Sequence, residues 1–148
     1  MPRGGDERMK QYDITNHVTV EEYQDFRRAV GWSLFGNEQA ENGLKHSYYI
    51  VCIRSEGKAV AMARVIWDHG YILFISDVMV LPEYQGQGLG RCLIEQIFQH
   101  IKTSIPSGYQ IRVTLLSAKG KESFYEKFGF ISRPNEMFGP GMHLWMEL

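Results

Sequence analysis

The middle of the chain alternates between long apolar stretches and short polar turns. Three stretches are rich in the β-branched and aromatic residues that favour strands, and short turns around Gly57 and Gly70 separate them. Turns this short join antiparallel strands as hairpins. Many positions are apolar on both faces, so we expect helices to cover both sides of the sheet. The three predicted strands are Ser47–Arg54, Lys58–Asp68 and Tyr71–Leu81.

Beyond Gly90 the apolar positions recur about every four residues, which is typical of an amphipathic helix. Pro106 and Gly108 end that predicted helix. A strand-like run, Tyr109–Leu116, follows it. Because a whole helix separates this run from Tyr71–Leu81, we expect the two strands to run parallel as a right-handed crossover. The recurring apolar residues are Leu89, Leu93, Ile97 and Ile101.

Shorter sequence patterns predict the remaining helices and strands. Thr19 followed by Glu22 is a capping box, in which the hydroxyl and the carboxylate each accept from a free backbone N–H. It predicts a helix over about Val20–Val30. A weaker helix is expected over Asn37–Leu44. The other predicted elements are a strand at Tyr12–His17, a helix at Lys119–Phe128 and closing strands at Phe130–Ser132 and Met142–Glu147.

Together these elements predict one α/β domain over residues 11–148. Its sheet is expected to be mixed and mostly antiparallel, with six or seven strands and helices on both faces. The opening Met1–Lys10 is polar, charged and glycine-rich, and we expect it to be poorly ordered.

Composition narrows the classes of function. The 148 residues carry a formal net charge of -1 and no basic stripe, so no nucleic-acid partner is expected. No signal peptide is visible and no apolar run is long enough to cross a bilayer, so we expect no membrane partner. Cys52 and Cys92 lie in apolar runs without ligand spacing, so we expect free thiols, no metal site and a cytoplasmic protein.

The segment Val80–Gly90 carries the most specific signal. A strand ends near Pro82, a glycine-rich loop follows and a helix begins, so free N–H groups and about half a positive charge face an approaching anion. Glycines in this loop let the backbone come close to phosphate oxygens. A Walker loop would need Gly-Lys-Ser/Thr, and the dinucleotide fingerprint would need glycine where Arg91 stands. The loop therefore predicts a phosphate site of another kind.

Two signatures together resemble a known enzyme family. The Q-x-x-G-x-G motif that begins at Gln85, after the V-x-P that begins at Val80, resembles motif A of the GCN5-related N-acetyltransferase (GNAT) family. Ser123–Phe130 resembles the second signature of that family, F-Y-x-x-x-G-F. Their order and separation fit the family, and the predicted strand order agrees over nearly the whole chain. The segment Gly139–Trp145 further resembles small bacterial-type members.

The resemblance implies acetyl-CoA as co-substrate, bound where the strands Tyr71–Leu81 and Tyr109–Leu116 splay apart. Main-chain groups would pair with its pantetheine arm as an added strand does, at Val78, Met79 and Val80. Backbone N–H groups would hold its pyrophosphate, from Gln85, Gly86, Gln87, Gly88, Leu89, Gly90 and Arg91. Further cofactor contacts are expected from Ser117, Ser123, Tyr125 and Lys127. Either serine could instead be a helix cap.

The same resemblance implies direct attack of a neutral primary amine on the thioester. A main-chain N–H near Asp77–Met79 would polarise the carbonyl, and Tyr125 would protonate the departing sulfur. Asp77 is the preferred base for the amine, and Glu22 and His143 are fallbacks. Asp77 could equally be a structural, hydrogen-bonded carboxylate.

The loop after the first predicted helix carries large apolar side chains, and in the family it commonly lines the acceptor pocket. Trp32 and Phe35 are therefore the candidate substrate-binding residues. We expect the acceptor to be a small-molecule amine. Two alternatives stay open: a protein acetyltransferase that acts on a lysine or an N-terminus, and a non-catalytic acyl-CoA sensor. Family members often dimerise, so a homodimer is a further option.

Overall fold

The computed structural model of the protein describes residues 11–148, so the expected disorder of Met1–Lys10 lies outside the described residues. The chain forms two compact units, which are divided between Thr114 and Leu115. In the described part of the chain, the first unit holds the sheet and the helices α1 to α3, and the second holds the short helix α4.

One five-stranded sheet forms the first unit, in the order β1-β2-β3-β4-β5. The strands β1 to β4 pair antiparallel, and β5 pairs parallel to β4. The predicted hairpins and the parallel crossover are therefore confirmed. The strands are β1 (Tyr12–Thr15), β2 (Tyr49–Ser55), β3 (Lys58–Trp67), β4 (Ile72–Val80) and β5 (Arg112–Thr114).

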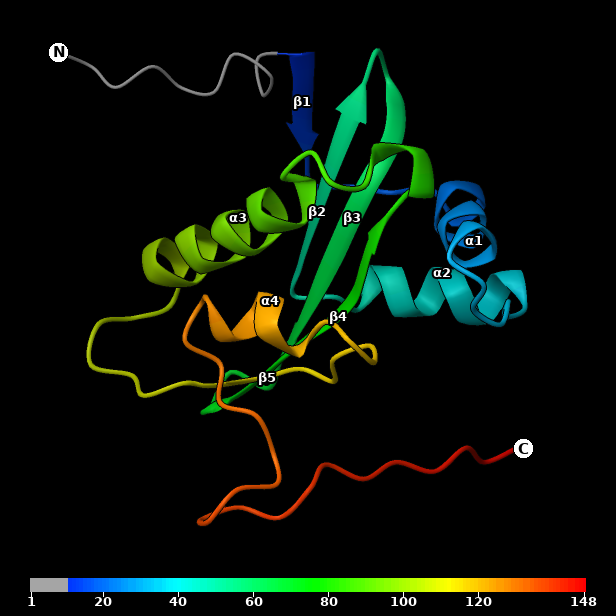
Figure 1. Cartoon of the computed structure of the whole chain (residues 1–148). Coiled ribbons are helices and arrows are strands. Elements are labelled where there is room, and N and C mark those ends of the chain that lie inside the picture. The colour runs from blue at the N-terminus through cyan, green and yellow to red at the C-terminus, as the bar shows by residue number, and fades with distance from the viewer. Residues whose placement is uncertain (1–10) are drawn as a thin grey trace, which may run out of the picture. The chain divides into compact units, whose positions relative to one another are not determined.

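Helices cover the two faces of this sheet. In Figure 1, α3 (Leu89–Ser104) lies on one side, and α1 (Val20–Ala29) and α2 (Asn37–Lys45) lie on the other. The consecutive residues Val60–Ala63 of β3 are all buried, which requires cover on both faces. The apolar face of α3 is buried as its period predicts, at Leu89, Leu93, Ile94 and Ile97. Among residues 11–148, no helix has both the length and the apolar character to cross a membrane.

Half of the capping box predicted at the start of α1 is confirmed. The hydroxyl makes its predicted contact, and the prediction for the carboxylate is wrong. The Thr19 hydroxyl accepts from the backbone N–H of Glu22 at 3.1 Å. The Glu22 carboxylate instead binds the guanidinium of Arg54 at 2.9 Å. Arg54 is almost buried on β2 and needs a counter-charge there, and this demand outweighs a local cap.

The second unit differs from the prediction. Its helix α4 covers Glu122–Glu126 and is shorter than expected. The predicted closing strands Phe130–Ser132 and Met142–Glu147 are not formed in the described structure, so a count of six or seven strands is not confirmed. An apolar run becomes a strand only where a neighbouring backbone completes its ladder. Between these two segments, the side chain of Asn135 accepts from two backbone N–H groups, a local turn that competes with strand pairing.

Candidate active site

A β-bulge interrupts β4 at Asp77. The register with β3 shifts between Met62 and Arg64, so β4 contains one residue more than β3 over this stretch. Asp77 has a φ of 53°, in the left-handed region that residues other than glycine rarely adopt. Bulges bend a strand and take a residue out of the ladder, and they are frequent beside active sites. Irregular backbone thus lies at Asp77 and Val78, where the thioester is expected.

The strands β4 and β5 are paired over one short stretch. Their parallel ladder covers only Ile72–Phe74 of β4, and β5 ends at Thr114. The strand β4 itself continues to Val80. The second half of β4 is therefore not paired with β5, which is the opening expected for the pantetheine arm at Val78, Met79 and Val80.

The glycine-rich loop leads from β4 into α3 through a short 3-10 helix, Pro82–Tyr84. Gly86 and Gly88 have φ values of 76° and 84°, which glycine adopts without strain. A Cβ at either position would meet nothing within 4 Å. Among the described residues, no side chain caps the N-terminus of α3, so its first N–H groups stay available to an anion. The loop has the open, donor-rich form that a pyrophosphate site needs.

Side-chain contacts hold this loop in place. Gln85 donates from Nε2 to the carbonyl of Val80 at 3.0 Å. Tyr12 of β1 donates its hydroxyl to Oε1 of Gln87 at 2.7 Å. The guanidinium of Arg91 pairs with a glutamate one turn along α3 at 2.7 Å. These contacts hold the loop at both ends, and they leave its backbone N–H groups available to a phosphate beside the remaining side-chain donors of Gln87 and Arg91.

The carboxylate of Asp77 is the centre of a buried ion cluster. One oxygen accepts from Nε of Arg64 at 2.6 Å and from the hydroxyl of Tyr23 at 2.7 Å. The other accepts from Nη1 of Arg27 at 3.3 Å. The side chains of Asp77 and Arg27 are each 8% exposed. Arg64 also donates to the carbonyl of Gly43 at 3.2 Å, so the cluster joins α1, α2, β3 and β4.

Burial and these contacts change the acidity of the cluster. Burial raises the pKa of Tyr23, and the hydrogen bond to Asp77 raises it further. Burial alone would lower the pKa of Arg64, but the hydrogen bond and the charge of Asp77 outweigh it, so the pKa is raised. At neutral pH the hydroxyl is protonated and both guanidinium groups are charged. The cluster therefore sets two positive charges against one carboxylate.

These contacts favour the structural alternative for Asp77. Both of its oxygens already accept hydrogen bonds, one from Arg27 and the other from Arg64 and Tyr23, so its acceptor positions are occupied by the protein. Of the two fallbacks, Glu22 is paired with Arg54, and His143 is exposed in the second unit. The identity of a base stays a prediction.

Trp32 and Phe35 both lie against Arg27. The central carbon of its guanidinium is 4.3 Å from the centre of the Phe35 ring and 5.5 Å from that of Trp32. Nε of the same guanidinium donates to the carbonyl of Ser33 at 2.6 Å. Through Arg27, the structure brings the two predicted acceptor residues beside Asp77.

The remaining predicted cofactor residues belong to the second unit. Tyr125 lies on α4, half-buried, with its ring centre 6.0 Å from that of Phe130. Burial raises its pKa, so its hydroxyl is protonated at neutral pH. Ser117 donates to the carbonyl of the next residue at 2.8 Å, and Ser123 and Lys127 are exposed. That these four residues complete the cofactor site stays a prediction.

Tyr23, Arg27 and Arg64 belong to none of the motifs recognised in the sequence. A signal for the arginines is nevertheless present. Arg64 interrupts the apolar run of β3, and Arg27 follows the apolar Phe26 on α1. A charged residue at a position that the pattern buries needs a partner. The one acidic residue in the predicted strand beside β3 is Asp77.

Comparison with known proteins agrees with this geometry. A family model described as Acetyltransferase (GNAT) domain matches residues 45–132. The uncharacterized N-acetyltransferase ycf52 of Porphyra purpurea is 30% identical over 129 residues, which cover 84% of this chain and 72% of the relative. Histone acetyltransferase TAP1 of Glycine max is 32% identical, and the match covers 82% of this chain and 56% of that protein.

Among solved structures, SA2161 of meticillin-resistant Staphylococcus aureus, a protein of unknown function and probable acetyltransferase, has a TM-score of 0.80 and 32% identity. That match covers 91% of this chain and 99% of the other. The fold, the loop and these matches define the class of protein: the chain belongs to the GNAT family. It is an N-acetyltransferase, and acetyl-CoA is the acyl donor that this family uses.

We expect Asp77→Asn to destabilise the fold. Two buried guanidinium groups would lose their shared counter-charge, and removing one partner of a buried ion pair costs about 3–5 kcal/mol of unfolding free energy. Chemical denaturation measures this loss. The control is Asp25→Asn, which breaks an exposed pair with Arg28 and should cost less than about 1 kcal/mol. A variant with full stability and lost turnover would contradict this and assign Asp77 to proton transfer.

Proposed function

We propose that the protein acetylates a primary amine of a small molecule, by direct attack of the amine on the thioester of acetyl-CoA. The observation that carries this proposal is the aromatic wall of Trp32 and Phe35 around Arg27, beside the bulge at Asp77. Side chains of α1 bind the carbonyls of this loop. The loop therefore suits a compact, partly apolar acceptor better than an extended peptide.

In this proposal, backbone groups hold the acyl donor. Main-chain groups of Val78–Val80, which β5 leaves unpaired, take the pantetheine arm, and N–H groups of Gln85–Arg91 take the pyrophosphate. A main-chain N–H at the bulge then faces the carbonyl oxygen of the thioester. Such a donor stabilises the developing oxyanion by about 3–4 kcal/mol.

We assign Tyr125 to the leaving group, which is the sulfur of coenzyme A. The reference pKa of a thiol is about 8.5 and that of tyrosine about 10, and burial raises the pKa of Tyr125 further. The hydroxyl is therefore the weaker acid, and complete proton transfer to the sulfur is uphill. A hydrogen bond to the developing thiolate needs no complete transfer, and we assign Tyr125 that role. We likewise assign Ser117, Ser123 and Lys127 to cofactor binding.

The acceptor has to react as a neutral amine, because an ammonium group has no free electron pair. A primary amine in water has a pKa of about 10, so most of it is protonated at neutral pH. With Asp77 already engaged by two guanidinium groups, we assign removal of this proton to water before the attack. Water also takes the second proton, which the nitrogen loses after its bond to the acetyl carbon forms and the bond from that carbon to sulfur breaks. Asp77 then acts by holding the bulge in place.

A protein acetyltransferase is the second candidate, because a relative of 32% identity is named a histone acetyltransferase. That reaction would need a groove for extended backbone beside Trp32. Cytoplasmic location, a homodimer, and the absence of metal, nucleic-acid and membrane partners remain proposals.

We expect small primary amines to support release of coenzyme A from acetyl-CoA, followed with a thiol reagent. The panel contains 2-phenylethylamine, spermidine, an α-amino acid, and peptides with either a lysine or a free N-terminus. Burial raises the pKa of Cys52 to about 11, so this thiol reacts slowly with the reagent near pH 8. If a peptide has a higher kcat/KM than every amine, the protein is instead a protein acetyltransferase. If no amine or peptide releases coenzyme A, the non-catalytic acyl-CoA sensor is favoured.

We expect Tyr125→Phe to lower kcat by about a hundredfold, because the leaving sulfur loses a hydrogen-bond donor. The affinity for acetyl-CoA, measured by calorimetry, should change little, since the ring stays in place. Tyr109→Phe is the control, because its hydroxyl lies on an exposed side chain of the first unit. Unchanged turnover in Tyr125→Phe would remove this residue from the mechanism.

A further inference from the structure

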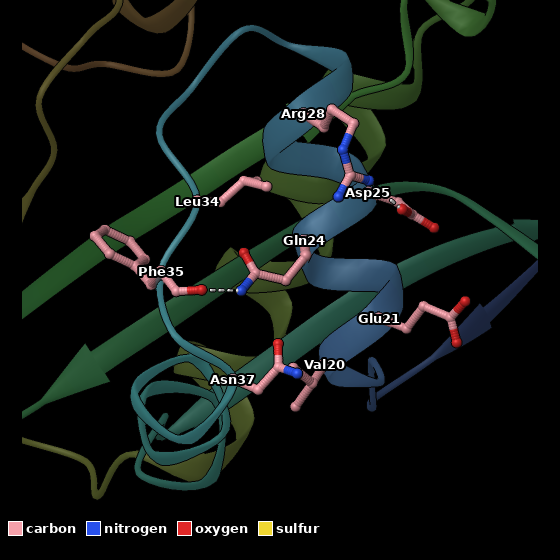
Figure 2. Close-up of a pocket in the computed structure, with 8 residues that line it drawn as sticks. All are labelled: Val20, Glu21, Gln24, Asp25, Arg28, Leu34, Phe35 and Asn37. Carbon is pink, nitrogen blue, oxygen red and sulfur yellow. Dashed lines mark hydrogen bonds and ion pairs between the residues drawn. The ribbon is translucent and has the colours of Figure 1, made fainter.

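Two side chains of α1 bind the loop that joins α1 to α2. Nε of Arg27 donates to the carbonyl of Ser33 at 2.6 Å, and Nε2 of Gln24 donates to the carbonyl of Phe35 at 2.5 Å. Figure 2 shows the contact of Gln24, where the loop passes beside α1. The two residues are three positions apart and so are neighbours on the surface of the helix, and α1 holds the loop at two nearby points.

Gln24 is buried, and only one half of its side-chain amide is paired within the described protein. Gln24 is 7% exposed, and its Oε1 has no hydrogen-bond partner in the described part of the chain. A buried acceptor without a partner is destabilising and rare. A cavity of about 610 Å³ borders Gln24 between α1 and the loop (Figure 2). The amide nitrogen is the half of this side chain that holds the loop, through the carbonyl of Phe35.

Arg27 connects this loop to the bulge of β4. Its edge binds the carbonyl of Ser33 and the carboxylate of Asp77, and its faces contact Phe35 and Trp32. A guanidinium can do all this because it is planar, with donors along its edge and faces that stack on rings. Arg27 thus sets the separation between the predicted acceptor wall and the backbone where the thioester is expected.

The same cluster carries a surplus of positive charge. Arg27 from α1 and Arg64 from β3 face the single carboxylate of Asp77, while Tyr23 contributes a neutral hydroxyl and α2 contributes the carbonyl of Gly43. A positive charge nearby disfavours an ammonium group and favours the neutral amine. A polyamine still carries other ammonium groups when one of its amines is neutral. Electrostatic repulsion by the two arginines therefore weakens the binding of polyamines most.

We propose that Arg27 is the positioning residue of the acceptor site. It holds the segment Trp32–Phe35 against the bulge of β4, and together with Arg64 it selects monoamines with an apolar body over polyamines. The aromatic wall takes the apolar body, and the surplus charge disfavours the polycation. This inference rests on the small-molecule function proposed above.

Steady-state kinetics with 2-phenylethylamine and spermidine test the proposal on three variants. Arg27→Met removes the charge and the loop contact together. Arg27→Lys keeps the charge but loses the Nε donor and the planar faces. Arg54→Met is the control, because Arg54 is also almost buried and ion-paired, yet its contacts are with Thr15, His17, Glu22 and Gly57.

The wild-type enzyme should have the higher kcat/KM with 2-phenylethylamine. Arg27→Met should raise the KM for this amine by about tenfold to a hundredfold, leave the KM for acetyl-CoA nearly unchanged, and reduce the preference over spermidine. Arg27→Lys should show the same rise in KM but keep the preference, because its charge remains. Arg54→Met should lower the unfolding temperature without changing the KM for the amine.

Each part of the proposal has an outcome that would overturn it. A wild-type KM in Arg27→Lys would show that charge alone suffices, and equal effects of Arg27→Met and Arg54→Met would make Arg27 merely structural. A wild-type preference for spermidine would overturn the selection of monoamines. If the wild-type enzyme acetylates peptides and neither amine, the proposed function itself fails, and this inference fails with it. Should Arg27→Met not fold, Arg27→Lys carries the test.

Discussion

The carboxylate of Asp77, shared between two buried arginines, is the interaction on which the site depends. It lies where β4 leaves its regular register, on a residue in a left-handed conformation that costs about 1–3 kcal/mol outside glycine. The contacts with Arg27 and Arg64 offset that cost and tie the bulge to α1 and β3. The packing of three elements and the shape of the backbone at the expected thioester position thus have one common cause.

The acyl donor is assigned to two features of the main chain in the first unit. One is the edge of β4 that β5 leaves unpaired, and the other is the N-terminus of α3, which no described side chain caps. The loop between them bends at glycines with positive φ, of which Gly88 is the last before the helix. In this proposal backbone groups bind the donor, so the fold fixes the position of the donor, and side chains determine which acceptor binds. The proposed roles of Trp32, Phe35 and Arg27 belong to that second task.

The architecture of the first unit could be predicted from the sequence because short turns and helix length leave few arrangements open. The short turns around Gly57 and Gly70 favour hairpins, and α3 is long enough to form the crossover that a parallel β5 needs. The ion cluster could not be predicted in the same way. Its members come from three separated elements, and the spacing of apolar residues does not show which buried charges face one another. The bulge could not be predicted either, because it depends on the register between two strands. In the second unit, an apolar run such as Met142–Glu147 is compatible with a strand. Its sequence does not show whether a neighbouring strand is present to pair with it.

We propose that the amides at the start of α3 and along the second half of β4 bind the main chain of acetyl-CoA, from its pyrophosphate to its pantetheine arm. A titration of isotope-labelled protein with coenzyme A, followed by the chemical shifts of its amide groups, tests this most directly. We expect the largest shift changes at Gln85–Arg91 and Val78–Val80, with saturation at a single dissociation constant. Saturable binding that leaves those amide signals in place, while others move, would contradict it.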